Sequence, residues 1–236
     1  QYRKSLAMDA NNLSVWQQML ICISETNDAN AMLEASDSAL VLFPEQSILY
    51  LFKGTALTLT KNHKEAVKAL LAGSKLVVDN NYQLLQFYTR LADNYHTLKE
   101  HDKSDSYYEK ALSIEPNDPL VLNNYSYYLS VRKEKLEKAE QMSKKCNEIR
   151  PGEPSYEDTY GWILYVMGRY QDARTWLQKA LDNGGSTNGT ILEHMGDVLF
   201  KLGDKDGALQ NWMKAKEAGE YSELLDKKIR DKQLYE

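Results

Sequence analysis

The residue types that most often bind metals or act as nucleophiles are few and scattered in this chain of 236 residues. Its four histidines are His63, His96, His101 and His194. No two of them have the His-x-x-x-His spacing that places two zinc ligands on one helix face. The two cysteines, Cys22 and Cys146, do not form a Cys-x-x-Cys pair, and we expect both to be core side chains. We therefore expect no metal site.

Phosphate-binding and acid–base chemistry find no better support in the sequence. Residues 184–189 are rich in glycine, but a phosphate-binding loop also needs a lysine and a preceding strand, so a junction between repeats is the better interpretation. Carboxylates such as Glu137, Glu140 and Glu148 fall on charged outer faces. We find no catalytic constellation, and we expect a protein that is not an enzyme and holds no cofactor.

Composition excludes further classes of function. The chain has 29 Lys and Arg against 34 Asp and Glu, so its net charge of −5 argues against binding nucleic acid through bulk charge. No apolar run reaches the roughly 20 residues that a membrane-spanning helix needs. The chain opens with Gln1 rather than methionine, and we expect it to be a piece of a longer protein.

The elements that would position any site repeat along the chain. Small residues recur in three series at matched positions 34 to 38 residues apart, although Leu20 begins the first series and Met32 the second. The first series is Leu20, Gly54, Ala92, Ser126, Gly161 and Gly196; the second is Met32, Ala66, Ser104, Ala139, Ala173 and Ala208; the third is Ala39, Gly73, Ala111, Cys146, Ala180 and Ala215. Small side chains let two helices cross closely, so each unit is predicted to be a pair of packed helices.

The spacing of apolar residues and the positions of prolines predict where each unit begins and ends. Leu177, Ala180 and Leu181 recur at i, i+3 and i+4, as on the buried face of a helix. Pro116 and Pro151 end second helices because proline cannot continue one. The predicted units are 13–46, 47–84, 85–118, 119–153, 154–188 and 189–222. Residues 1–12 are predicted to end a preceding second helix, and residues 223–236 to form a capping helix. The second unit is about one helical turn longer, around residues 77–81, which either lengthens its second helix or bends the array.

This pattern resembles the tetratricopeptide repeat, a helix–turn–helix unit of about 34 residues. Trp16, Tyr50 and Tyr88 match its early aromatic position, and Tyr108 and Trp212 fill its large position in the second helix. The resemblance implies an all-α fold, a right-handed α-solenoid superhelix of antiparallel helix pairs. It also implies a concave face lined by first-helix side chains that receives partner peptides.

Projecting the repeat onto the chain predicts which side chains line that concave face. They are Phe52, Arg90, Asp93, Asn123, Asn124, Tyr127, Asp158, Trp162, Tyr165, Glu193, His194 and Asp197. Aromatic residues with polar atoms are favoured interface anchors, although Tyr127 and Trp162 serve equally well as packing residues. The carboxylates Asp93, Asp158, Glu193 and Asp197 predict an acidic groove, and hence a neutral or basic partner.

We therefore expect a non-enzymatic scaffold or adaptor that binds a protein or peptide segment. The alternatives are a self-associating or spacer array, and a regulatory part of a larger protein whose activity lies elsewhere. The blocks 122–129 and 158–165 resemble those of bacterial members of the family, some of which are envelope lipoproteins. This resemblance implies the periplasm of a bacterial cell envelope, with the cytoplasm as the alternative.

Overall fold

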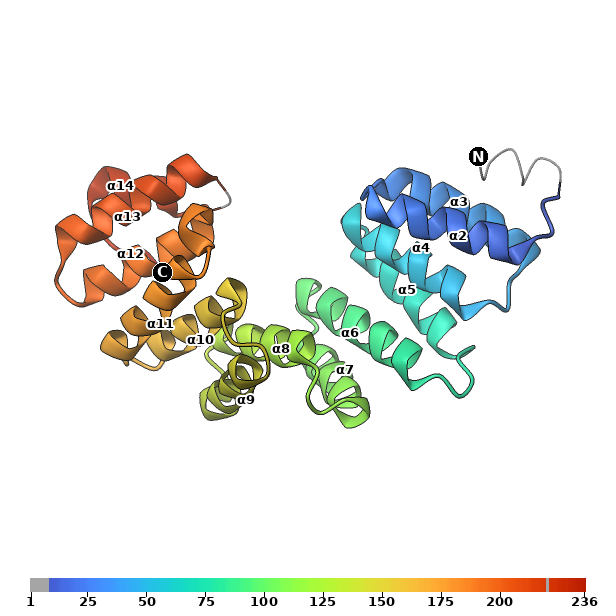
Figure 1. Cartoon of the computed structure of the whole chain (residues 1–236), viewed down its shortest axis with the longest axis horizontal. Coiled ribbons are helices and arrows are strands. Elements are labelled where there is room, and N and C mark those ends of the chain that lie inside the picture. The colour runs from blue at the N-terminus through green and yellow to red at the C-terminus, as the bar shows by residue number, and fades with distance from the viewer. Residues whose placement is uncertain (1–8, 220) are drawn as a thin grey trace. The chain divides into compact units, whose positions relative to one another are not determined.

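A computed structural model describes residues 9–219 and 221–236, and helices are the only regular elements in those ranges (Figure 1). The helices are α2 Leu13–Glu25, α3 Ala29–Leu42, α4 Ser47–Leu59, α5 His63–Ser74, α6 Asn81–Thr97, α7 His101–Ile114, α8 Pro119–Val131, α9 Leu136–Ile149, α10 Pro154–Val166, α11 Tyr170–Asp182, η1 Gly185–Thr187, α12 Gly189–Lys201, α13 Lys205–Ala218 and α14 Leu225–Asp231. The predicted all-α fold class of paired helices is confirmed.

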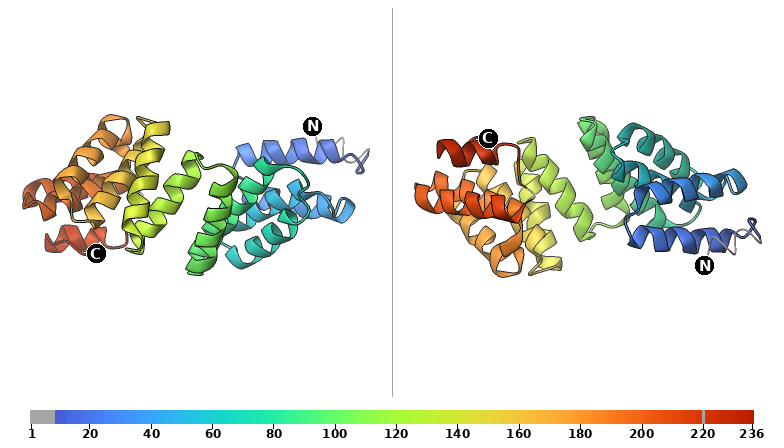
Figure 2. Two further views of the ribbon diagram at one scale, coloured as in Figure 1. Left: turned by 90° about the horizontal axis from the view of Figure 1, so that it is seen from below. Right: turned by 90° about the horizontal axis from the view of Figure 1, so that it is seen from above.

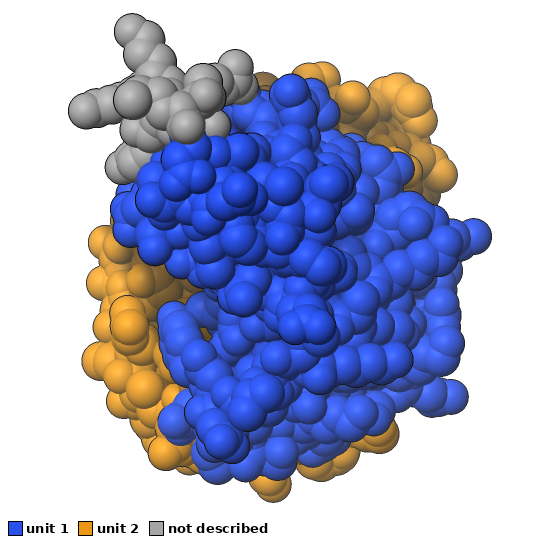
Figure 3. Space-filling model, turned by 90° about the vertical axis from the view of Figure 1, so that its right-hand side faces the viewer, with its two compact units in different colours: residues 1–116 blue, residues 117–236 orange. Residues whose placement is uncertain are grey.

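The chain divides into two compact units, residues 1–116 and 117–236, which Figure 3 colours separately. In the first unit α2 packs on α3, α4 on α5 and α6 on α7, and Figure 2 shows these pairs from two further sides. Polar side chains start several of these helices: Asn12, Asp28 and Asn80 each accept a hydrogen bond from a backbone N–H three residues ahead. Such caps satisfy N–H groups that have no partner within the helix.

Close crossings within the helix pairs require small residues. A Cβ atom placed on Gly54 of α4 would lie 2.5 Å from Leu70 of α5. One placed on Gly161 of α10 would lie 2.8 Å from Leu177 of α11. Both distances are shorter than a carbon–carbon contact allows, so the recurring small residues are explained by contact between the two helices of a pair.

The second unit contains the pairs α8–α9, α10–α11 and α12–α13, followed by α14. The first helices contact one another in turn, because α10 touches both α8 and α12. Its core includes Leu177, Met195 and Trp212, and it extends to Leu225 of α14, which is fully buried. This last contact holds α14 against the end of the stack.

Three boundaries differ from the sequence prediction. The second helix of the second pair, α5, ends at Ser74 and is not lengthened; the additional residues instead let α6 begin at Asn81, four residues before position 85. The capping helix spans only Leu225–Asp231, because Lys232 adopts a left-handed conformation that ends it. Of the predicted helical residues 1–12, residues 1–8 lie outside the described part and residues 9–12 form a turn before α2.

None of the described helices combines the length and the hydropathy of a membrane-spanning segment.

Candidate functional site

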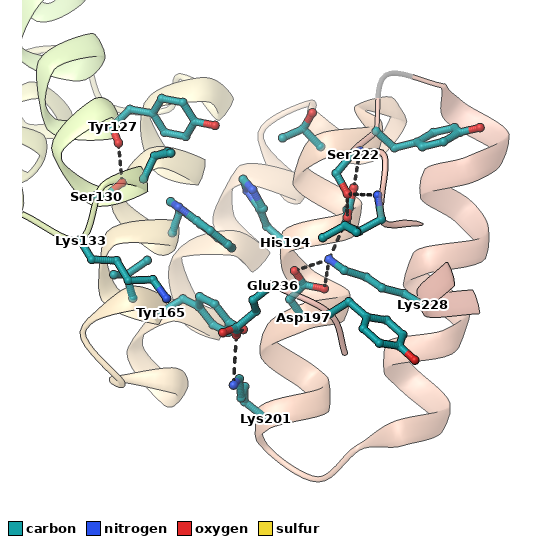
Figure 4. A pocket seen from close by; sticks show the side chains of 18 of the residues that line it. Tyr127, Ser130, Lys133, Tyr165, His194, Asp197, Lys201, Ser222, Lys228 and Glu236 are labelled. Atoms are coloured by element: carbon teal, nitrogen blue, oxygen red, sulfur yellow. Dashed lines mark hydrogen bonds and ion pairs between the residues drawn. The ribbon is translucent and has the colours of Figure 1, made fainter. Parts of the chain in front are cut away.

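A cavity of about 600 Å³ lies within the second unit, among the first helices of its three pairs and the C-terminal residues (Figure 4). We call it the pocket. Each first helix contributes side chains spaced three or four residues apart, the spacing that places them on one helix face. These are Tyr127, Ser130 and Val131 of α8; Trp162, Tyr165 and Val166 of α10; and Glu193, Asp197 and Lys201 of α12.

Aromatic rings form one wall of the pocket. Trp162 is half-buried and stacks on Tyr165, with ring centroids 4.9 Å apart and planes inclined by 21°. Trp162 also stacks on His194, with the ring centroids 4.2 Å apart and the planes again inclined by 21°. Stacked aromatic rings hold one another in a fixed orientation, so this wall is preorganised for contact with a ligand.

The imidazole in this stack is held by a carboxylate of the neighbouring first helix. His194 Nδ1 lies 2.8 Å from Asp158 Oδ1, and both side chains are about nine-tenths buried. Burial by itself lowers the pKa of His194, but the charge and hydrogen bond of Asp158, together with Asp197 and Glu193, raise it above the ordinary value. Protonation of His194 is therefore more favourable in the folded chain than in the unfolded chain.

This arrangement predicts a pH-dependent contribution to stability. Because the pKa of His194 is higher when folded, its contribution is complete below the unfolded pKa of about 6.5 and is lost as the pH rises through the folded pKa. We expect the melting temperature of wild type to exceed that of His194→Gln most at about pH 6 and least at about pH 9. Thermal unfolding across pH measures this. Asp158→Asn should show the same weakened pH dependence, and parallel profiles for all three proteins would contradict it.

The floor of the pocket is a buried ion-pair network. Lys228 of α14 donates to Glu193 Oε1 at 2.8 Å and to the two oxygens of Asp197 at 2.8 and 2.7 Å. The side chains of all three residues are at most 5% exposed. Ser222 also donates its backbone N–H and its hydroxyl to Glu193, and Trp212 donates its indole N–H to Asp197 at 2.9 Å. The network thus joins α12, α13 and α14.

The two carboxylates of the network respond differently to burial. Burial opposes ionisation of Glu193, yet hydrogen bonds from Lys228 and Ser222 hold its pKa below the ordinary value. For Asp197 burial dominates over the attraction of Lys228, and its pKa is raised. Although Lys228 is paired with both carboxylates, the pKa of Glu193 is lowered and that of Asp197 is raised.

These contacts correct the picture of an acidic groove. Glu193 and Asp197 do not face solvent as free negative charges, because Lys228 is paired with both. Asp158 is buried against His194. The predicted preference for a neutral or basic partner rested on these carboxylates, and in their paired state they do not supply it.

The last residues of the chain close one side of the pocket. The Glu236 carboxylate accepts a hydrogen bond from the Tyr165 hydroxyl and lies 3.0 Å from Lys201 Nζ. Figure 4 shows Glu236 between these two residues. Burial of the Tyr165 phenol, and next its hydrogen bond to Glu236, raises the pKa of that phenol, so Tyr165 keeps its proton and donates a hydrogen bond to the carboxylate.

The predicted site residues separate into those that line the pocket and those that do not. Six line it: Tyr127, Trp162, Tyr165, Glu193, His194 and Asp197. Asn123 and Asn124 are half-buried on α8 outside the lining, and Asp158 lies behind His194.

The other three predicted site residues belong to the first unit, where they are engaged in packing. Phe52 packs half-buried against the core around α2, α3 and α4. Arg90 Nε donates to Thr55 Oγ1 at 2.9 Å, and burial lowers the pKa of its guanidinium. Asp93 accepts a hydrogen bond from the Tyr108 hydroxyl. These residues therefore have structural contacts independent of any partner.

Sequence reasoning missed the contribution of the C-terminal residues, above all Lys228 and Glu236. For Lys228 a signal existed: it follows Leu225 by three residues and precedes Ile229, so it shares the apolar stripe of the capping helix. A lysine on a buried stripe requires a buried counter-charge, and Glu193 and Asp197 were available. No comparable signal marks Glu236. Within the described residues, no group of three or more His, Cys, Asp or Glu side chains is placed to hold a metal ion.

Comparison with known proteins identifies the repeat. Two models described as "Tetratricopeptide repeat" match residues 85–118 and 107–141. The TPR repeat-containing protein PA4667 of Pseudomonas aeruginosa is 28% identical over 139 residues, and the human protein O-mannosyl-transferase TMTC1 is 26% identical over 152 residues. These alignments cover 58% and 63% of this chain, but the chain spans only 23% and 17% of the two relatives.

Among solved structures, the hetero-tetramer of Cut9 and Hcn1 from the APC/C is similar with a TM-score of 0.78. The match covers 98% of this chain and 45% of the other at 17% identity. At an identity this low, the similarity shows a shared fold and nothing more.

Proposed function

We propose that this chain, a tetratricopeptide repeat protein of bacterial type, is a non-enzymatic adaptor that binds a segment of a partner protein in the pocket of its second unit. The fold by itself supports a protein–protein interaction scaffold with protein or peptide partners. The transferase activity in the name of TMTC1 is not carried over, since the chain spans a small part of that relative.

The observation that carries the proposal is the aromatic cavity of about 600 Å³. Its volume falls within the range typical of ligand sites, about 300–1,000 Å³. Its rim carries large apolar side chains that are unusually exposed for their type: Val131 at 48%, Tyr221 at 40% and Leu224 at 38%. Exposed apolar side chains beside a preorganised aromatic wall are typical of a surface that receives an apolar anchor side chain.

A related assembly is consistent with this role. The similar solved chain belongs to the Cut9–Hcn1 hetero-tetramer, so a protein with this fold occurs there in an assembly with another protein. For the present chain we propose that the partner inserts one apolar side chain beside Trp162, where indole and imidazole rings offer a flat contact surface.

Affinity capture tests this proposal. Proteins retained by the immobilised chain are identified, and the segment responsible is synthesised and titrated against the purified chain. We expect Trp162→Ala to weaken binding of that segment at least about tenfold, as for an interface hot spot, while leaving the fold intact. Trp176→Ala, a half-buried tryptophan of α11 outside the pocket, should leave binding unchanged.

A second variant keeps the test decisive if Trp162→Ala unfolds. Val131→Glu places a charge on an exposed rim residue without disturbing the core. It should block binding while the melting temperature stays near that of wild type. Unchanged binding in a folded Val131→Glu protein would reject the pocket as the binding site.

The location of the parent protein is also a proposal. We place it in the bacterial cell envelope because the blocks 122–129 and 158–165 resemble those of envelope members of the family. Reading the N-terminal sequence of the parent protein for a signal with a lipid-attachment cysteine tests this, and a start without such a signal favours the cytoplasm.

A further inference from the structure

The C-terminal residues form two parts, which are attached to the rest of the second unit by different contacts. The first part is α14, anchored by the buried Leu225 and by Lys228 within its ion-pair network. The second part, residues 232–236, begins at the left-handed Lys232 and ends with Glu236 at the edge of the pocket. We call residues 232–236 the tail.

Leu234 of the tail packs against the core of the second unit, but the ion pair made by Glu236 is more exposed than those made by Lys228 of α14. The Lys228 network is at most 5% exposed, whereas the side chains of Lys201 and Glu236 are 32% and 39% exposed. Ion pairs that exposed are screened by water and contribute little to stability. The carboxylate of Glu236 is therefore more readily displaced than Lys228, and α14 keeps its own contacts when Glu236 leaves.

The groups around the Glu236 carboxylate are suited to an anion. Tyr165 donates a hydrogen bond from its hydroxyl, Lys201 supplies a direct positive charge, and Lys133 also lines the pocket. The hydrogen bond from Tyr165 and the charges of Lys201 and Lys133 outweigh burial and lower the pKa of Glu236. This subsite favours a carboxylate over a neutral amide of the same size.

We propose that the tail is a built-in competitor for the pocket, and that the partner segment enters by placing the carboxylate of its own Asp or Glu between Tyr165 and Lys201 in place of Glu236. This inference rests on the proposed function, because it assumes that the partner segment binds in this pocket. It defines that segment as one with an apolar anchor next to an acidic side chain.

The physical basis is competition between an intramolecular and an intermolecular ligand. A tethered segment acts at an effective concentration of about a millimolar, so it suppresses weak ligands and yields to those that make additional contacts. A partner that fills the aromatic wall beside Trp162 as well as the carboxylate subsite makes contacts that Glu236 alone does not.

Peptide titration on the full chain and on a chain ending at Asp231 tests the inference. The probe is a fluorescently labelled peptide, Lys-Gln-Leu-Tyr-Glu-amide, which has the sequence of the tail; its partner probe carries Gln in place of Glu. We expect the shortened chain to bind the Glu probe at least tenfold more tightly than the full chain does. It should also prefer the Glu probe to the Gln probe by at least fivefold.

Substitutions assign the preference to the subsite. Lys201→Met in the shortened chain should remove the preference for the Glu probe, whereas Lys205→Met, an exposed lysine outside the pocket, should retain it. If the shortened chain is unstable, Glu236→Gln in the full chain provides the same comparison and should raise affinity for the Glu probe. Equal binding of both probes, or equal affinity of full and tail-free chains, would overturn the inference.

Failure of this inference is distinguishable from failure of the proposed function. Suppose that partner capture depends on Trp162 but not on Lys201 or on the tail. The pocket is then still the binding site, and the inference that the partner places a carboxylate beside Lys201 is rejected. If partner capture depends on neither Trp162 nor Val131, the proposal that the pocket is the binding site is rejected.

Discussion

Replacing Lys228 with methionine is expected to lower the free energy of unfolding of the second unit by about 3–5 kcal/mol. The substitution keeps the apolar part of the side chain but leaves Glu193 and Asp197 buried without the cation that pairs with both. The penalty arises from two desolvated carboxylates rather than from lost packing. Chemical denaturation followed by circular dichroism measures it.

The control lies one residue earlier on the same helix. Lys227 is exposed, and Lys227→Met should change stability by no more than about 1 kcal/mol. Adding Glu193→Gln and Asp197→Asn to the Lys228 variant should restore much of the loss, because neutral amides tolerate burial better than unpaired carboxylates. A Lys228→Met protein as stable as wild type would show that these acids are protonated or hydrated in solution.

Trp212→Ala is expected to destabilise the same unit by about 3–5 kcal/mol, the range for removing a large buried aromatic side chain. Trp212 is 1% exposed and fills the space above Gly196, where an added Cβ would lie 2.4 Å from the indole ring. Alanine leaves this space empty and also removes the hydrogen bond to Asp197. Thermal and chemical unfolding report the change.

Two further variants divide this loss into its parts. Trp212→Phe keeps most of the volume but cannot donate to Asp197, so its cost should fall below that of alanine and reflect mainly the hydrogen bond, roughly 1–3 kcal/mol. Trp176→Ala, at a half-buried position on α11, should cost less than Trp212→Ala. If Trp176→Ala costs more, burial is not the controlling quantity.

The helix pairs could be predicted from the sequence because each pair imposes the same local demand. A close crossing admits only small side chains, and this demand recurs at Gly54, Gly161 and Gly196 opposite Leu70, Leu177 and Trp212. The start of α6 was misplaced for a related reason. Residues 81–84 carry no small-residue signal, so their spacing alone did not show whether they lengthen the preceding helix or the following one.

The pocket could be predicted in part. Six of its residues follow from first-helix periodicity, since side chains at i, i+3 and i+4 share a face. The charge state of that face could not be predicted in the same way. It depends on where Lys228 and Glu236 fold back, and these are long-range contacts with α12 and α10 that no repeat pattern encodes.

The same kind of hydrogen bond occurs once within each of the two units. Asp93 of α6 accepts from Tyr108 of α7, and Asp197 of α12 accepts from Trp212 of α13; the acceptor precedes the donor by 15 residues in both cases. Each contact lies inside a single helix pair, so a phenol and an indole serve the same purpose in two copies of one module. In the second of these pairs Lys228 of α14 binds the same carboxylate, so the hydrogen bond that joins the two helices of the pair also anchors the helix that ends the stack.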